Sequence, residues 1–200
     1  MGNQIYSFLL LKSLYEPAAV FENLSKADPS PFTVLFRYSL WLVILPPLFA
    51  YIGASNFGWR LGADEPLMMA RESLIIISLG YFWVLVVGLI TPSIISQWMA
   101  TTYGAAASLG RHMALITIVG EPLAIGSLAH LFPNVFMNIL VMIPAMIWAM
   151  YLLYKGIPIV LGIPPERGML MASALVGWLL GAAVSLLGMS MMFWTLGLVP

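Results

Sequence analysis

Long stretches without a charged residue constrain the fold of this 200-residue chain more than any motif does. Residues 38–59, 73–110, 122–154 and 168–200 contain no Asp, Glu, Lys or Arg. Hydrophobic residues make up 62% of the chain and charged residues 8%, whereas a soluble domain is about 45–50% apolar and about 25% charged. So few charges cannot cover a soluble surface, and about 20 apolar residues span a bilayer as a helix. The sequence therefore predicts an all-α, polytopic membrane helix bundle.

The charge-free stretches divide into five predicted transmembrane helices. We expect them at about residues 33–53, 71–90, 111–131, 134–155 and 169–195. Turn-forming residues support the joints: Thr91-Pro92 follows the second helix, and Pro133-Asn134 separates the third from the fourth. Residues 92–110 are rich in Ser, Thr and Gln, so we expect an interfacial or re-entrant stretch there.

The first 31 residues are predicted to form a separate amphipathic segment ahead of the first span. Pro17 suits the first turn of a helix. Three apolar residues then share one face of that helix, namely Val20, Phe21 and Leu24. We expect residues 1–31 to lie on the cytoplasmic leaflet or, equally well, to be tucked under the bundle. Residues 32–200 then form the transmembrane domain.

The Lys and Arg residues of the short loops predict an orientation. With the N-terminus in the cytoplasm, most basic residues lie inside: Lys12, Lys26, Arg37, Arg111, Lys155 and Arg167. Only Arg60 and Arg71 then lie outside. Because basic loops favour the cytoplasmic side, we expect a cytoplasmic N-terminus and, after five spans, a C-terminus on the opposite side of a bacterial inner membrane.

The composition argues against several classes of function. The chain has no cysteine, which removes disulfides and thiolate metal sites, and its balanced charge gives no nucleic-acid-binding face. No HExxH or GxSxG motif is present. His112 and His130 lie about 27 Å apart along a helix, so they cannot share a metal, and we interpret them as wetted interface histidines. We expect no enzymatic activity and no cofactor.

Glu121, followed by Pro122, is the most unusual residue of the predicted spans. A carboxylate at mid-membrane depth is costly, so it is protonated or paired and marks a functional site by default. Two interpretations stay open: a packing or assembly role through hydrogen bonds between helices, and the handling of an ion or proton by a small transporter or channel. The candidate partners of Glu121 are Arg37, Tyr38, Thr117 and Asn138.

Small residues recur at every fourth position of the fifth predicted helix: Ser173, Gly177, Gly181 and Ser185. Gly177 and Gly181 form a GxxxG motif, which lets two helix backbones approach closely in a membrane. The stripe indicates helix packing, but it does not say whether the neighbouring helix belongs to the same chain.

Residues 151–168, with the sequence YLLYKGIPIVLGIPPERG, resemble the Yip1 family of five-span membrane proteins. The bacterial branch of that family carries a YxLYxGxP…G(V/T)P stretch between its fourth and fifth spans. The matching residues here are Tyr151, Tyr154, Gly156, Pro158, Pro164 and Pro165. Eukaryotic members bind small prenylated GTPases through a longer N-terminus with a DLYGP-like motif, and because that motif is absent, the resemblance does not imply GTPase binding here.

The signature residues also have a physical interpretation. Tyr151 and Tyr154 suit the inner membrane interface, with Lys155 at the lipid headgroups. Gly156 is expected to end the helix in a left-handed cap, and the prolines that follow stiffen the loop. Together these features predict a non-enzymatic organiser, adaptor or accessory subunit of a larger membrane assembly. It would contact the lipid bilayer and either other membrane subunits or copies of itself.

Overall fold

The computed structural model describes residues 12–60, 65–105 and 107–195, and within these ranges the chain is almost entirely helical. The elements, in chain order, are α2 (Pro17–Lys26), α3 (Pro31–Val34), η1 (Leu35–Ser39), α4 (Leu40–Phe57), α5 (Arg71–Thr102), α6 (Leu109–Gly126), η2 (Ser127–Leu131), α7 (Val135–Leu161) and α8 (Pro165–Thr195). Two isolated backbone pairings, Trp59 with Leu67 and Arg60 with Asn134, hold the loop between α4 and α5 beside the turn between η2 and α7.

Five segments of the described chain are long and apolar enough to cross a membrane: Pro31–Phe57, Arg71–Thr102, Leu109–Leu131, Val135–Leu161 and Pro165–Ser185. The first of these joins α3, η1 and α4 into one span, and the third joins α6 to η2. The prediction of an all-α bundle with five transmembrane helices is therefore confirmed.

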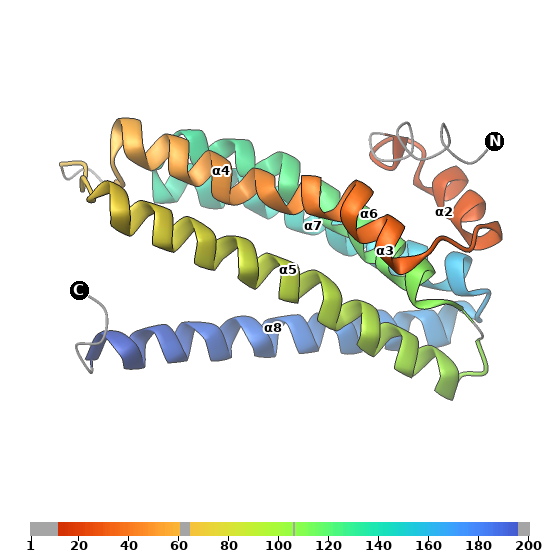
Figure 1. Cartoon of the computed structure of the whole chain (residues 1–200). Helices are drawn as coiled ribbons and strands as arrows, with labels where there is room; N and C mark the ends of the chain where they lie inside the picture. The colour runs from red at the N-terminus through yellow and green to blue at the C-terminus, as the bar shows by residue number, and fades with distance from the viewer. Residues whose placement is uncertain (1–11, 61–64, 106, 196–200) are drawn as a thin grey trace.

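The long helices run lengthwise through the bundle, and α2 lies at one end of it (Figure 1). Helices α4, α6 and α7 form one group, and α5 and α8 cross each other beside it (Figure 1). The connections from α5 to α6 and from α7 to α8 lie at the same end as α2 (Figure 1). The connection from α4 to α5 lies at the opposite end (Figure 1).

Helix α5 corrects the prediction for residues 92–110. The helix does not end at Thr91-Pro92 but continues to Thr102, so residues 92–102 belong to the second span rather than to an interfacial or re-entrant stretch. Pro92 removes one backbone donor, yet the hydroxyls of Thr91 and Ser93 donate to the carbonyls of Val87 and Leu89, at 2.9 and 2.7 Å. Such hydroxyls and neighbouring helices let proline persist inside a membrane helix.

Helix α7 corrects the interpretation of Gly156 as a helix cap. The helix continues to Leu161, and the left-handed residue that ends it is Gly162, with φ 64°. A Cβ at Gly156 would lie 2.7 Å from Leu115 Cδ1 and 2.9 Å from Phe21 Cζ. The absence of a side chain at Gly156 therefore lets Leu115 of α6 and Phe21 of α2 pack closely against α7.

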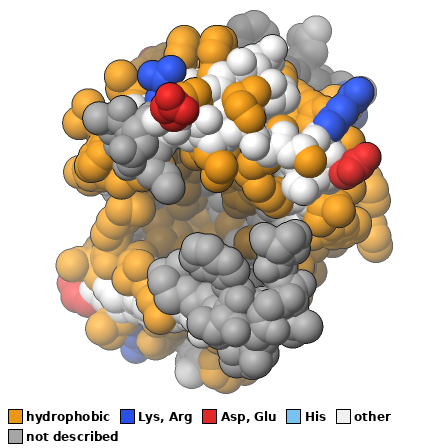
Figure 2. All heavy atoms as spheres, turned by 90° about the vertical axis from the view of Figure 1, so that its left-hand side faces the viewer, with side chains coloured by type: hydrophobic (Ala, Val, Ile, Leu, Met, Phe, Trp, Pro, Cys, Tyr) orange, Lys and Arg blue, Asp and Glu red, His pale blue; other side chains and the backbone are white. Residues whose placement is uncertain are grey.

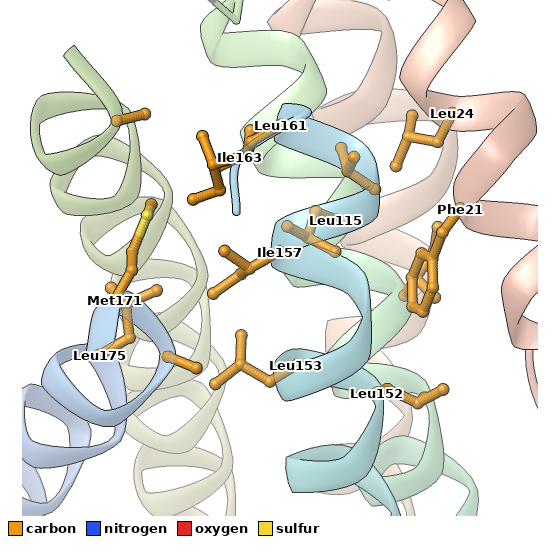
Figure 3. Packing of buried hydrophobic residues seen from close by; sticks show 14 of the residues in the cluster. Phe21, Leu24, Leu115, Leu152, Leu153, Ile157, Leu161, Ile163, Met171 and Leu175 are labelled. Carbon is orange, nitrogen blue, oxygen red and sulfur yellow. The ribbon is translucent and has the colours of Figure 1, made fainter. Parts of the chain in front are cut away.

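The larger hydrophobic cluster joins α2, α6, α7 and α8 at the end of the bundle where α2 lies. Figure 3 shows α7 in the middle of this cluster, with Phe21 and Leu24 of α2 on one side and Met171 and Leu175 of α8 on the other. The side chain of Phe21 is fully buried. The amphipathic face predicted for α2 thus packs against the helix bundle.

Candidate functional site

The third span, which joins α6 to η2, is the most enclosed span of the described chain, and it carries more buried polar side chains than any other span. In the 18-residue apolar stretch of this span, 44% of the residues are buried, compared with 17–28% for the other four spans. Four polar side chains of this span are fully or almost fully buried: His112, Thr117, Glu121 and Ser127. Because a buried polar group is costly without a hydrogen bond, the partners of these residues define the candidate site.

Glu121, the residue singled out from the sequence, binds the N-terminal segment. Its side chain is 2% exposed, and its Oε2 accepts a hydrogen bond from Oγ of Ser13, which is also buried. Two of the expected partners have other bonds: Thr117 is 2.7 Å from Ser39 and donates to the carbonyl of Met113, while Asn138 binds His130. Sequence reasoning missed Ser13 because nothing in its local pattern distinguishes it from other serines.

His112 corrects the interpretation of the histidines as wetted interface residues. Its side chain is fully buried, and its Nδ1 lies 2.7 Å from Oγ of Ser96 on α5. Its Nε2 has no hydrogen-bond partner among the described residues. The reason for the difference is the continuation of α5 past Pro92, which places Ser96 opposite the start of α6.

His130 lies at the other end of the same span and joins three elements. Its Nδ1 binds Oδ1 of Asn138 on α7, and its Nε2 lies 3.5 Å from the hydroxyl of Tyr81 on α5. Asn138 in turn donates to the carbonyls of Phe132 and Asn134, at 3.1 and 2.8 Å. The histidine thus fixes the turn between η2 and α7 against α5.

The polar side chains of α6 and η2 reach different neighbours rather than a shared cavity. Their partners come from the N-terminal segment (Ser13), η1 (Ser39), α5 (Ser96 and Tyr81) and α7 (Asn138). No group of three or more His, Asp or Glu residues in the described chain is placed to hold a metal. Chemically, this arrangement ties four segments to one central helix.

The residues of the predicted signature connect α7 to α8. The hydroxyl of Tyr154 lies 2.9 Å from Oγ of Ser173. A Cβ atom placed on Gly168 would lie 2.9 Å from the ring of Pro158, so the two helices are close there. Pro164 precedes α8, and Pro165 is its first residue. These contacts hold the first turns of α8 tightly against the end of α7.

Pro122 and the remaining signature residue, Tyr151, lie on the outer side of the contact between α6 and α7. Pro122 lines a pocket there, and the ring of Tyr151 packs at a tilt against Trp148, with 4.9 Å between the ring centroids. Lys155 Nζ donates to the hydroxyl of Tyr151 at 2.8 Å.

No described segment of the chain packs closely against the small-residue stripe of α8 at Gly177 and Gly181. A Cβ atom placed on Gly177 or Gly181 would have no described atom within 4 Å. The hydroxyl of Ser185 donates to the carbonyl of Gly181. Bulky side chains around the stripe are exposed, including Trp178, Leu180 and Val184. In Figure 2, hydrophobic side chains cover most of the visible flanks, and the few charged side chains are scattered.

Five apolar helices with polar side chains turned inward define an integral, polytopic helical membrane protein. The Yip1 domain matches residues 11–189, so the chain belongs to the Yip1 family. It is similar to the inner membrane protein YohC of Escherichia coli strain K12 and of E. coli O6:H1. Each is 28% identical over 161 residues, which cover 80% of this chain and 83% of the relative. No solved structure matches the chain.

Proposed function

We propose that this protein is a non-enzymatic inner-membrane adaptor that associates with a further transmembrane helix through the second half of α8. The observation that carries this proposal is the open stripe at Gly177 and Gly181. The resemblance to a protein named as an inner membrane protein supports the same membrane for this chain. The partner helix belongs either to another membrane subunit or to a second copy of this chain.

The packing of α8 explains why this surface is suited to association. Its first turns are buried against α7 and α5 through Gly168, Met171, Ala172 and Leu175. Between Gly177 and Ser185, by contrast, no residue is buried. Lipid supplies no hydrophobic driving force between helices, so association depends on close backbone contact, which glycines permit. A partner helix can therefore gain close packing at this surface that no described helix of the chain provides.

The alternative function, a small transporter or channel that uses Glu121, has less support from the geometry. Glu121 is buried and hydrogen-bonded to Ser13, and the other polar groups of α6 turn to different neighbours. A packing role explains this arrangement without a continuous polar path. In proteoliposomes, an ion or proton flux that disappears in Glu121→Gln would instead favour the transporter.

The adaptor proposal is tested by replacing both glycines of the stripe. In the double variant Gly177→Leu and Gly181→Leu, we expect the complex seen by native mass spectrometry after mild detergent extraction to dissociate. The matched control is Gly80→Leu with Gly88→Leu, because these α5 glycines are also open on their Cβ side. A wild-type protein that is monomeric under these conditions, or a stripe variant that assembles as the control does, would overturn the proposal.

A further inference from the structure

We propose that the outer face of the contact between α6 and α7 binds one anionic phospholipid, with an acyl chain in an apolar pocket and the headgroup phosphate at Lys155. This inference goes beyond the adaptor function and does not rest on it, since it concerns α6 and α7 rather than the stripe of α8.

The pocket has a volume of about 430 Å³ and opens to the outside of the bundle. Every residue that lines it is apolar or aromatic: Leu14, Pro122, Ile125, Gly126, Ala145 and Trp148. Ligand pockets in proteins have volumes of roughly 300–1,000 Å³. Because α6 and α7 are both membrane-spanning segments, the medium outside this opening is lipid hydrocarbon. An acyl chain is thus the occupant whose chemistry fits the walls.

Close packing at Gly126 shapes the pocket. A Cβ at Gly126 would lie only 3.0 Å from Cβ of Ala145, so α6 and α7 touch there and the recess forms beside the contact. Leu14 closes the recess from the N-terminal segment. That residue follows Ser13, whose bond to Glu121 holds this wall against α6. The pocket is therefore assembled from three segments that are fixed to one another.

A row of side chains leads from the pocket along α7. Trp148 lines the pocket and packs on Tyr151, with 4.9 Å between ring centroids. Lys155 follows: its Nζ lies 2.8 Å from the hydroxyl of Tyr151 and 5.2 Å from the centre of that ring. Residues three and four positions apart share a helix face, and seven residues rise about 10 Å. The row thus runs from acyl-chain depth toward the headgroups.

Lys155 supplies the charge that selects the lipid. No carboxylate in the part of the chain that the structure describes forms an ion pair with Lys155. Tyr151 orients the ammonium group by its hydroxyl without cancelling its charge. Basic groups between transmembrane helices bind the phosphates of anionic lipid headgroups. A phosphate at Lys155 and a chain beside Trp148 belong to one lipid molecule, because they lie on one face of one helix.

The proposal is tested by titrating delipidated protein in detergent with phosphatidylglycerol or phosphatidylcholine of identical chains, and by counting bound lipid with native mass spectrometry. We expect one phosphatidylglycerol to bind, about fivefold more tightly than phosphatidylcholine, as one favourable lysine contact provides. In Lys155→Gln this preference should disappear. The matched control is Lys26→Gln, which removes an exposed lysine of α2 and should keep the preference.

A second pair of variants tests the acyl-chain pocket separately from the headgroup. Ile125→Trp fills the pocket and should weaken both lipids, whereas Val87→Trp, at an exposed position of α5, should weaken neither. Glycerol phosphate, which has the headgroup chemistry without chains, should not compete. The proposal is overturned if wild-type protein shows no preference for the anionic lipid, if each variant behaves as its control does, or if glycerol phosphate displaces the bound lipid.

Discussion

Ser13 donates a hydrogen bond to Glu121, although the two residues are 108 positions apart in the chain. Glu121 belongs to the third span, and Ser13 precedes the first. A second hydrogen bond also joins the N-terminal residues to α6: Nε of Arg111 donates to the carbonyl of Ala27 at 2.9 Å. The described N-terminal residues are therefore attached to α6 by polar contacts at both ends of α2.

The first prediction concerns the bond between Ser13 and Glu121. Ser13→Ala leaves the buried Oε2 of Glu121 without this donor, and an unmet buried polar group costs about 1–3 kcal/mol. We expect a loss of that size in the free energy of unfolding, measured by denaturant titration in detergent micelles. Ser25→Ala is the control, because its hydroxyl bonds only the nearby carbonyl of Glu22 on the surface.

A double-mutant cycle isolates the same interaction. Combining Ser13→Ala with Glu121→Leu, which removes the acceptor, should give a coupling energy of roughly 0.5–3 kcal/mol, which is the range for residues in direct contact. Strictly additive effects of the two substitutions would show that the bond contributes nothing to stability.

The second prediction concerns the close approach at Gly156. Gly156→Leu would clash with Leu115 and Phe21, so we expect α2 to leave its place on α7. Because the chain has no cysteine, a single Val20→Cys reports this directly: Val20 is fully buried. Maleimide should label that cysteine slowly in the parent and rapidly in Gly156→Leu. With Gly120→Leu, where nothing lies within 4 Å, labelling should stay slow; equal labelling of all three proteins would contradict the packing.

The third prediction concerns the buried imidazole of His112. Ser96→Ala removes the partner of Nδ1 and should lower the free energy of unfolding by about 1–3 kcal/mol. Ser96→Ala combined with His112→Leu removes both polar groups and should recover much of this loss, since an apolar pair leaves nothing unsatisfied. Ser93→Ala is the control, because that serine bonds only the carbonyl of Leu89 in its own helix. A double variant less stable than Ser96→Ala alone would refute this account.

The fourth prediction concerns the orientation expected from the basic residues. Glu65→Cys lies in the loop between α4 and α5, and Asn23→Cys lies on the exposed side of α2. A membrane-impermeant maleimide applied to intact spheroplasts should label Glu65→Cys at once. It should label Asn23→Cys only after the membrane is permeabilised. The reverse pattern would place the N-terminus outside.

The ends of the helices were harder to predict than their existence. Thr91-Pro92 and Gly156 carry breaker signals, yet α5 and α7 continue through both. Breaker rules describe helices whose ends are stabilised by water. In a membrane segment, the hydroxyls of Thr91 and Ser93 bond nearby backbone carbonyls, and Gly156 is selected by the closeness of Phe21 rather than by a turn.

The sequence predicted some residues of the candidate site but not the residues that bind them. Glu121 is conspicuous because a carboxylate inside an apolar span is costly, and the stripe of α8 is visible from its four-residue period. The serines that complete the site, Ser13 and Ser96, have no such mark, because a hydroxyl is tolerated almost anywhere in a helix.

The sequence by itself determined the number of spans, the helical class and the family, because each membrane helix satisfies its backbone hydrogen bonds within its own apolar segment. Only the tertiary structure decided that Ser13 meets Glu121, that Ser96 meets His112, and that the stripe at Gly177 meets no described helix. These facts depend on how segments far apart in the chain pack side by side, and the local composition of a helix does not specify its neighbours.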